Sequence, residues 1–358
     1  MGEEKEIMKA LIVCFANLRG VPYIYPYINI LKKNNIKTDI VYWNRHGIDE
    51  KIDCSNLYVY SHYQRDEDNK FIKLIRMYSY TRYVEKIIKK NSYEKIIILS
   101  SLPGVLMETY LVKNKKNQYI FDIRDHSYEQ FKPYYNRMKK LMQNSALNVI
   151  SSSGFRNFLP NEDTVICHNI TSYTNMKNNH VEKKDKIIIS FIGQIRYANK
   201  YLNFMESIKN NERIVFRFYG FGEDEEYLKN YVALHKFNNI EFYGAYMPSE
   251  KSTIIQKSDI LFNVYGSDLH VKYAISNKYY DALIYKKPLL VSKNTTMDDI
   301  TQGIAFSVDD AVFDAIELIR WYDNIDFVKL EDICEKKLKN VQSDMIAFEK
   351  AVESVFTI

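Results

Sequence analysis

The sequence predicts an α/β protein built from two doubly wound parallel sheets joined by a linker. Apolar runs of four to seven residues recur along the 358-residue chain, and helical stretches separate most of them. Such runs are typical of strands buried on both faces, and their alternation with helices indicates parallel sheets covered by helices. The chain is longer than one hydrophobic core usually supports, which favours two domains.

The first predicted domain covers residues 1–171 and begins with the apolar run K-A-L-I-V-C-F at 9–15. A helix that ends near Lys33 follows this strand. We expect further strands at 38–43, 57–60, 95–99, 118–122, 147–150 and 164–167. In a sheet of this kind, ligands bind beyond the carboxyl ends of the strands, so the loops that follow these runs are the candidate binding regions.

The second predicted domain covers residues 187–340, after a polar segment at 172–186 that we interpret as the linker. We expect its strands at 187–192, 214–219, 240–243, 260–264, 289–292 and 304–308. From about residue 311 the chain is predicted to be helical, since Val312, Ile316 and Ile319 recur at helical spacing. The terminal helix at 341–358 is expected to pack back on the first domain.

Composition narrows the class of protein. Hydrophobic residues make up 46% of the chain, charged residues 27%, and the net charge is +5, whereas a dedicated nucleic-acid-binding protein usually carries a stronger basic bias. The four cysteines form no C-x-x-C pair, which argues against a zinc site. No apolar run reaches the roughly 18 residues that span a bilayer, and the acidic start is unlike a signal peptide. We therefore expect a cytoplasmic protein.

The segment S-N-K-Y-Y-D at 276–281 predicts a helix with a polar N-terminus. Ser276 or Asn277 can cap this helix, and Lys278 and Asp281 are three residues apart and share one face. A helix N-terminus with a cation and a carboxylate suits the phosphates and ribose hydroxyls of a nucleotide. The alternative is a surface ion pair on an ordinary amphipathic helix.

Glycines end two predicted strands of the second domain. Gly193 is followed by Arg196 and Lys200, which could meet a diphosphate, while the alternative is a turn glycine followed by solvated basic residues. Gly220 and Gly222 precede an acidic helix start and are further candidates for nucleotide binding. Their spacing does not complete G-x-G-x-x-G, so this motif is weak by itself.

The first domain has its densest group of titratable residues in F-D-I-R-D-H-S at 121–127. Asp122, Arg124, Asp125 and His126 follow a strand, where mutual charge and burial could tune a catalytic acid or base. A structural ion-pair network is the alternative.

Residues 70–90 form a basic stretch, with seven Lys or Arg residues against Glu85. Aromatic and apolar residues alternate with the cations, as in a helix that lies on an anionic membrane surface. The alternative is an exposed helix that packs on the domain through Ile72, Ile75 and Val84.

Taken in order, these motifs resemble the GT-B glycosyltransferases of the family-four type, in particular enzymes of bacterial capsule, O-antigen and other surface polysaccharide assembly. The resemblance spans nearly the whole chain. It rests on D-I-R-D at 122–125, F-I-G-Q-I-R-Y at 191–197, F-Y-G-F-G-E at 218–223, N-I-E-F-Y-G-A-Y at 239–246, S-D-I-L-F-N-V-Y at 258–265 and N-K-Y-Y-D-A-L-I-Y-K-K-P at 277–288.

The resemblance implies metal-independent transfer of a sugar, with retention of configuration, from a UDP- or GDP-sugar to a saccharide or lipid-linked acceptor. No further cofactor is implied. The second domain would bind the donor and the first domain the acceptor, at the inner face of the cell membrane. The acceptor and linkage would depend on first-domain loops such as 18–25 and 100–105.

Individual roles follow from the same resemblance. Asp281 stands where the family has a glutamate that binds the ribose hydroxyls, and Arg196, with Lys200 or Lys278, would neutralise the leaving diphosphate. Asp125 or His126 stands at the first-domain position near the reacting sugar.

The family's first acidic residue is replaced by Tyr273, eight positions before Asp281. Two other functions stay open, and this difference favours the second of them. One is a GT-B nucleotide-sugar 2-epimerase, and the other is a non-catalytic subunit that binds a nucleotide or glycan.

Overall fold

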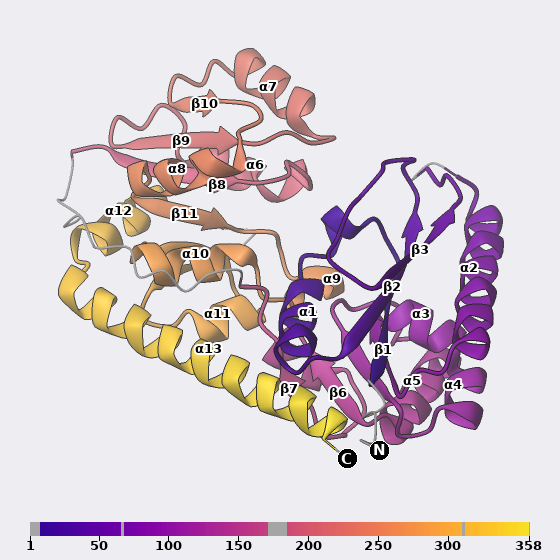
Figure 1. Cartoon of the computed structure of the whole chain (residues 1–358). Helices are drawn as coiled ribbons and strands as arrows, with labels where there is room; N and C mark the ends of the chain where they lie inside the picture. The colour runs from indigo at the N-terminus through magenta and orange to yellow at the C-terminus, as the bar shows by residue number, and fades with distance from the viewer. Residues whose placement is uncertain (1–7, 66–67, 171–184, 310–311, 358) are drawn as a thin grey trace. The chain divides into compact units, whose positions relative to one another are not determined.

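The computed structural model describes residues 8–65, 68–170, 185–309 and 312–357. The chain forms two compact units (Figure 1): unit 1 consists of Met1–Asn169 with Ser343–Ile358, and unit 2 of Ile170–Gln342. Most of the predicted linker at 172–186 lies outside the described residues.

Unit 1 contains a seven-stranded sheet in the order β3-β2-β1-β4-β5-β6-β7, and every neighbouring pair is parallel. The strands are β1 (Lys9–Cys14), β2 (Lys37–Asn44), β3 (Asn56–Ser61), β4 (Lys95–Leu99), β5 (Tyr119–Ile123), β6 (Leu147–Ile150) and β7 (Val165–Ile166). The strand order reverses direction between the neighbouring strands β1 and β4, so the topological switch point of the unit lies at their carboxyl ends.

Helices cover both faces of the unit 1 sheet (Figure 1). They are α1 (Ile24–Lys33), α2 (Lys70–Lys90), α3 (Ser101–Leu106), α4 (Glu108–Asn114) and α5 (Lys132–Asn144), with short 3-10 helices η1 (Leu18–Gly20) and η2 (Ser153–Asn157). Alternate residues of β1 face opposite sides: Ile12 joins the core beneath α1, whereas Phe15, just after the strand, contacts the ring of Tyr80 from α2.

Unit 2 contains a six-stranded parallel sheet in the order β10-β9-β8-β11-β12-β13. The strands are β8 (Ile187–Ile192), β9 (Ile214–Tyr219), β10 (Ile240–Phe242), β11 (Ile260–Asn263), β12 (Leu289–Ser292) and β13 (Ala305–Val308). All of the strands predicted from apolar runs are therefore present in the two units. The winding reverses between β8 and β11.

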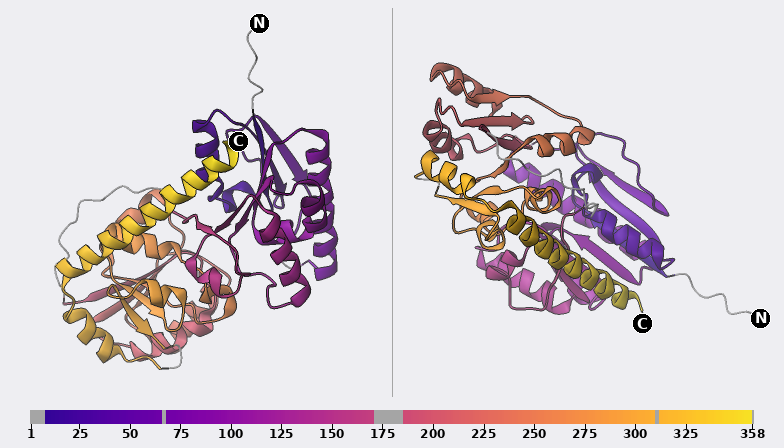
Figure 2. Two further views of the ribbon diagram at one scale, coloured as in Figure 1. Left: turned by 90° about the horizontal axis from the view of Figure 1, so that it is seen from below. Right: turned by 90° about the vertical axis from the view of Figure 1, so that its left-hand side faces the viewer.

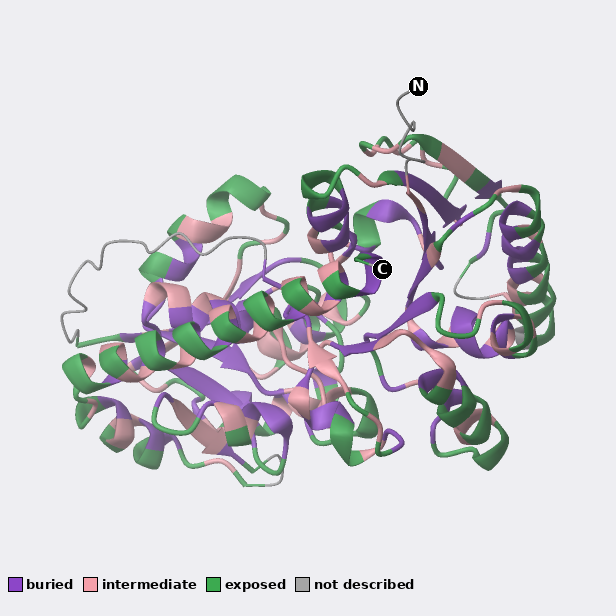
Figure 3. Ribbon diagram, turned by 60° about the horizontal axis from the view of Figure 1, so that its bottom comes forward, coloured by how far each residue is buried: buried purple, intermediate pink, exposed green. Residues whose placement is uncertain are grey.

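The helices of unit 2 follow its strands. They are η3 (Ala198–Lys200), α6 (Leu202–Ser207), α7 (Glu225–Leu234), η4 (Pro248–Glu250), α8 (Lys251–Lys257), α9 (Leu269–Lys272), α10 (Asn277–Tyr285), α11 (Thr296–Ile300), α12 (Ala315–Asp323) and α13 (Phe327–Phe356), the last of which continues into unit 1. Figure 3 shows mostly buried strands and helices whose outer faces are exposed.

The prediction that the chain is helical from about residue 311 is wrong at the start of this segment. Helix α12 begins at Ala315 because the Asp314 side chain caps it, accepting from the N–H groups of Ile316 and Glu317. The buried face of this helix therefore starts at Ala315, and Val312 and Ile316 are 74% and 59% exposed.

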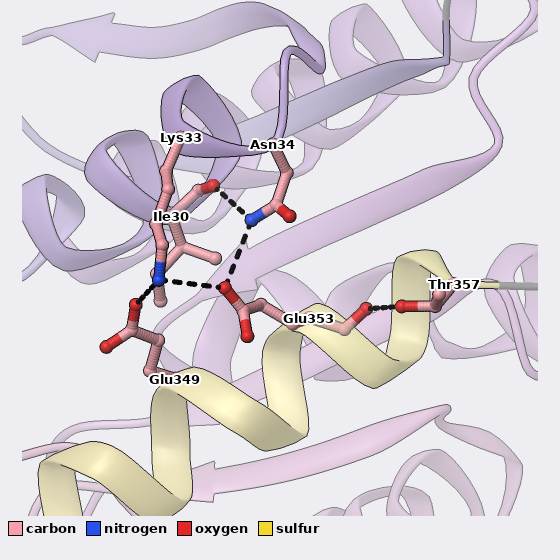
Figure 4. Close-up of polar contacts among 6 residues, drawn as sticks. All are labelled: Ile30, Lys33, Asn34, Glu349, Glu353 and Thr357. Carbon is pink, nitrogen blue, oxygen red and sulfur yellow. Dashed lines mark hydrogen bonds and ion pairs between the residues drawn. The ribbon is translucent and has the colours of Figure 1, made fainter.

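Helix α13 is one unbroken helix in both views of Figure 2. Within unit 1, its Phe348 ring contacts the ring of Tyr27 from α1 at 5.1 Å. Figure 4 shows ion pairs between α1 and α13, in which Lys33 Nζ lies 2.6 Å from Glu349 Oε1 and 3.3 Å from Glu353 Oε1. The terminal helix thus supplies part of the core of unit 1.

Candidate functional site

A pocket of about 320 Å³ lies at the switch point of unit 2, and we call it the α10 pocket. It is lined by Ile192, Gly193, Gln194, Arg196, Tyr197, Tyr246, Lys251, Tyr265, Ser276, Asn277, Lys278 and Asp281. Five residues that the sequence singled out therefore meet in one place: Gly193, Arg196, Asn277, Lys278 and Asp281. Three cations and one carboxylate line the pocket, which gives it an excess of positive charge.

The loop after β8 forms one wall of the α10 pocket. Gly193 has φ of 134°, a conformation that side chains rarely adopt, and a Cβ there would point into open space. Tyr197 adopts the left-handed conformation with φ of 62°. The Tyr201 hydroxyl donates to the carbonyl oxygen of Arg196, and the N–H of Ala198 donates to Asp224 Oδ2 at 2.9 Å. These bonds hold the loop at the mouth of the pocket before any ligand binds.

Gly220 and Gly222 lie beneath this loop. A Cβ at Gly220 would be 1.8 Å from the carbonyl oxygen of Gly193, and one at Gly222 would be 2.0 Å from that of Ile195. No side chain fits in either space, so both positions require glycine for packing. Among the described residues that line the α10 pocket, neither glycine is present.

Helix α10 supplies the opposite wall. The Ser276 side chain caps it and accepts from the N–H of Lys278 at 3.3 Å. The Lys278 side chain is buried, its Nζ lies 4.8 Å from the centre of the Phe191 ring, and it donates to the Tyr265 hydroxyl. In the described part of the chain, no carboxylate pairs with Lys278. A buried ammonium with aromatic neighbours and no carboxylate partner can hold an anion.

Asp281 faces the pocket one turn further along α10 and pairs with Lys251, whose Nζ is 2.8 Å from each carboxylate oxygen. This contact orients the carboxylate and leaves further lone pairs for hydroxyl donors. Burial and the nearby Asp281 raise the pKa of Tyr246, so its hydroxyl stays protonated at neutral pH.

Arg196 and Lys200, the two basic candidates that follow β8, differ in whether an acidic side chain pairs with them. Arg196 is exposed at the pocket, and no acidic side chain of the described residues pairs with it. Lys200 lies outside the described lining of the pocket, and its Nζ is 3.4 Å from Asp268 Oδ2. Arg196 is therefore the cation of this loop that remains available to a ligand.

In unit 1, the cluster at the carboxyl end of β5 divides into a buried and an exposed part. Asp122 is fully buried and accepts from Arg124 at 2.5 Å and from the Tyr27 hydroxyl at 2.7 Å, while Arg124 also donates to the carbonyl oxygen of Cys167 at 2.9 Å. Burial raises the pKa of Asp122, and the Arg124 guanidinium opposes that rise. These two residues thus form the structural ion-pair network that was the alternative interpretation.

The two proposed catalytic residues of this cluster have different surroundings. Asp125 is exposed. The His126 ring is buried, lies against Phe158 at 4.8 Å between ring centres, and has Nε2 at 3.8 Å from Glu129 Oε2. Burial also raises the pKa of Glu129. Glu129 can therefore hold a proton at a higher pH than an exposed carboxylate.

The loop after β4 carries an unusual backbone conformation at Ser100, with φ of 84° and ψ of 147°. Next to it, Ser101 Oγ lies 3.0 Å from Ser127 Oγ and accepts from the Tyr134 hydroxyl at 3.1 Å. Strain of this kind gathers at functional sites. Ser100 is the first residue of the segment 100–105 that the sequence suggested as an acceptor-binding loop. That prediction is wrong for residues 101–105, which belong to helix α3 because the chain turns directly from β4 into this helix.

Sequence reasoning missed several residues that line the α10 pocket, namely Tyr197, Tyr246, Lys251, Tyr265 and Ser276 in its role beside the pocket. Lys251 belongs to a helix start without a ligand motif, and its partner Asp281 is 30 residues away. The signal that could have found Tyr246 and Lys251 is their position just after a predicted strand, where ligands bind.

No protein-family model matches the sequence, and no curated protein matches it. Solved structures match over nearly the whole chain. The chain is similar to sucrose-phosphate synthase from Thermosynechococcus elongatus, with a TM-score of 0.73 at 10% identity over 98% of this chain and 99% of that one. The chain is also similar to the lipopolysaccharide outer core galactosyltransferase WaaB, with a TM-score of 0.62 at 14% identity over 95% of this chain and 99% of that one. HepE from Anabaena, in complex with UDP and glucose, matches with a TM-score of 0.60 at 11% identity over 98% of this chain and 100% of that one.

These likenesses, together with the two parallel sheets, show that the fold is that of the GT-B glycosyltransferases. The predicted fold class is confirmed.

Proposed function

We propose that the protein is a retaining glycosyltransferase that moves a sugar from a UDP- or GDP-sugar to a saccharide or lipid-linked acceptor without a metal ion. The observation that carries this proposal is the α10 pocket. There, two cations without carboxylate partners among the described residues, Arg196 and Lys278, adjoin the N-terminus of α10. This arrangement suits a diphosphate.

The residues of the pocket have distinct tasks in this reaction. As the bond from the anomeric carbon to the diphosphate breaks, negative charge grows on the leaving oxygen, and Arg196 and Lys278 stabilise it. Asp281, oriented by Lys251, accepts hydrogen bonds from the ribose hydroxyls of the donor. Gly193 leaves room for the phosphates to approach the backbone. Lys200 has a secondary role because Asp268 already neutralises it.

Unit 1 binds the acceptor in this proposal. Asp125 and His126 are its candidate residues near the reacting sugar, and the strained Ser100 lies at the N-terminus of α3. The place in bacterial surface glycan assembly is supported by the likeness to WaaB, a lipopolysaccharide galactosyltransferase, and the nucleotide donor by the likeness to HepE, which holds UDP.

Replacing Arg196 with Ala tests the proposal. We expect the loss of one charge-stabilising group to lower transfer by about 10²-fold to 10³-fold while the fold stays intact. Isothermal titration with UDP and GDP, followed by transfer assays over a panel of donors and acceptors, measures both effects. Arg320→Ala, an exposed arginine on α12, is the matched control and should change neither. Undiminished turnover in Arg196→Ala would exclude this assignment.

The same measurements separate the two other functions. A nucleotide-sugar 2-epimerase would convert the donor when no acceptor is present, so product analysis with donor alone identifies it. A non-catalytic subunit would bind UDP or GDP without transfer, epimerisation or hydrolysis across the panel.

A membrane contact through α2 is a second part of the proposal. Phe71, Ile72, Leu74, Ile75 and Tyr78 in its first half are 44% to 69% exposed. Val84 is buried as expected for a packed helix, but Ile72 and Ile75 are not, so apolar surface and cations are presented together. In the described part of the chain, no helix has the length and hydropathy to cross a bilayer. An interfacial position suits a helix of this kind.

Vesicle sedimentation tests this contact. We expect the protein to sediment with vesicles that contain phosphatidylglycerol, and we expect less binding after Phe71→Ser with Ile75→Ser or after Lys86→Gln with Lys90→Gln. Leu234→Ser, which changes a residue of unit 2 that is 78% exposed, is the control. Binding that is insensitive to both double changes would rule out α2 as the contact.

A further inference from the structure

A second pocket of about 260 Å³ adjoins the α10 pocket, and we call it the Asn263 pocket. It lies at the carboxyl ends of β11 and β12 and shares Tyr197, Tyr265 and Ser276 with the α10 pocket. Because the two pockets have common walls, a ligand whose diphosphate occupies the α10 pocket can extend a substituent into the Asn263 pocket.

The walls of the Asn263 pocket are mostly apolar and include Val271, Ala274 and Met297. Two of its polar side chains already have structural tasks. Ser292 Oγ accepts from the N–H groups of Tyr265 at 3.2 Å and Gly266 at 2.9 Å.

Thr295 is the second polar residue of the pocket whose side chain has a structural task. Its hydroxyl donates to the carbonyl oxygen of Ser292 at 2.8 Å and accepts from the N–H of Asp298 at 3.2 Å, where it caps α11. Both hydroxyls already make hydrogen bonds within the protein, so neither of them calls for a ligand as its partner.

Asn263, the last residue of β11, is different. Its side chain lines the pocket and is only 4% exposed, and its Oδ1 is buried without a hydrogen-bond partner in the described part of the chain. A buried amide without a partner costs free energy, and buried polar groups almost always have one. The position therefore points to a partner that a bound ligand supplies.

We propose that the Asn263 pocket binds the acetamido group of a 2-acetamido sugar on a nucleotide donor. This inference rests on the proposed function and names its donor class. The acetamido N–H donates to Asn263 Oδ1, which gives this buried oxygen the hydrogen-bond donor that it lacks. The methyl group lies against Val271, Ala274 and Met297.

Other substituents fit this lining less well. A hydroxyl group supplies the donor that Asn263 Oδ1 needs, but it brings no apolar part for the walls. A methyl group alone fills the walls and leaves the amide without a partner, which loses the hydrogen bond. The acetamido group satisfies both features at once.

Titration calorimetry with UDP, UDP-glucose, UDP-N-acetylglucosamine and UDP-N-acetylgalactosamine tests the inference. In the wild-type protein we expect an acetamido donor to bind about tenfold more tightly than UDP-glucose. Asn263→Leu should abolish this preference and leave the affinity for UDP unchanged. Its melting temperature should equal or exceed that of the wild type, because an amide without a partner has been removed.

Controls make the outcomes distinct. Asn230→Leu changes an exposed residue on α7 and should keep the preference. Asn263→Ala removes the amide without filling the pocket and replaces Asn263→Leu if that variant does not fold. Equal affinities for the glucose and acetamido donors, or a preference that survives both Asn263 changes, would overturn the inference. Binding of GDP without UDP would also overturn it but keep the proposed function, whereas binding of no nucleotide would reject the proposed function itself.

Discussion

The two units place charged residues beyond the same kind of strand end, but they use them differently. In unit 1, Asp122 and Arg124 are buried and bind each other, Tyr27 and the backbone of Cys167. In unit 2, Lys278 is just as deeply buried, yet no carboxylate of the described residues meets it. The difference teaches that the partner of a charge, rather than its position in the fold, separates a structural cluster from a candidate binding site.

The energetics of burial explain this contrast. A buried ion is expensive unless groups nearby compensate for its lost hydration. The protein itself compensates Asp122 and Arg124. The Lys278 ammonium contacts the rings of Phe191 and Tyr265 and the Tyr265 hydroxyl, and no carboxylate of the described residues pairs with it. Part of the compensation is therefore left to a ligand. Four experiments test the contrast, from the largest expected effect to the smallest.

Removing one partner of the unit 1 pair should have the largest effect on stability. We expect Arg124→Met to lower the free energy of unfolding by about 3–5 kcal/mol, because Asp122 stays buried without its cation. The chain has two tryptophans, Trp43 in unit 1 and Trp321 in unit 2, so urea unfolding followed by Trp43 fluorescence in a Trp321→Phe background reports on unit 1.

The double change Asp122→Leu with Arg124→Met is the control, because it removes both charges and should destabilise the unit less than Arg124→Met alone. A loss below about 1 kcal/mol in the single variant would show that this pair is not the structural centre that we describe.

Removing the buried cation of unit 2 should change binding and spare stability. We expect Lys278→Met to weaken nucleoside diphosphate binding about tenfold or more, since it removes a charge-assisted contact to phosphate. Titration calorimetry measures this effect, and Trp321 fluorescence in a Trp43→Phe background should show unit 2 at least as stable as before. Lys200→Met is the control and should reduce affinity much less, because Asp268 pairs with Lys200. A large loss of stability in Lys278→Met would assign Lys278 to structure.

The stability of unit 1 should also depend on pH through His168, with a smaller effect than the two changes above. Burial lowers the pKa of His168, although its contact with Asp344 Oδ2 at 3.0 Å opposes the shift. Below the usual pKa of about 6.5, the unfolded chain therefore takes up a proton before the folded one does. The free energy of unfolding should fall as the pH drops through this window, by at most about 1.4 kcal/mol per pH unit from this group.

His168→Asn isolates this contribution, because other titrating groups are common to both proteins. Urea unfolding between pH 5 and pH 7.5, followed through Trp43, should give a flatter pH dependence for the variant. Parallel curves for the two proteins would contradict the assignment.

The exposed ion pairs between α1 and α13 should matter least. Lys33 contacts Glu349 and Glu353, but water and salt screen these charges (Figure 4). We expect Lys33→Ala to leave the urea midpoint of unit 1 unchanged within error. Loss of Phe348 packing is the informative comparison, and Phe348→Ala should lower the midpoint clearly, because its ring lies in the core against Tyr27.

Residues at strand ends were the predictable part of the candidate site. Gly193 and Arg196 could be named because a ligand site in a doubly wound sheet lies beyond strands that are visible as apolar runs. Lys278 and Asp281 could be named because their spacing places them on one face at the polar start of a predicted helix. Gly220 and Gly222 were named for the same reason, but they pack beneath the β8 loop. The distinction between them depends on a distance of 1.8 Å to another loop, which no sequence pattern reports.

By itself, the sequence determined the order of strands and helices, the two-domain GT-B fold and the strand ends where polar residues gather. The order of the elements and the strand ends follow from local hydrophobicity, because a strand buried on both faces must be apolar throughout. The GT-B fold was implied by the resemblance of the motifs. Only the tertiary structure decided that Asp281 pairs with Lys251, that Asp122 and Arg124 satisfy each other, and that Asn263 Oδ1 has no partner among the described residues. Pairing of charges and amides depends on contacts between segments far apart in the chain, so the fold has to form before these roles exist.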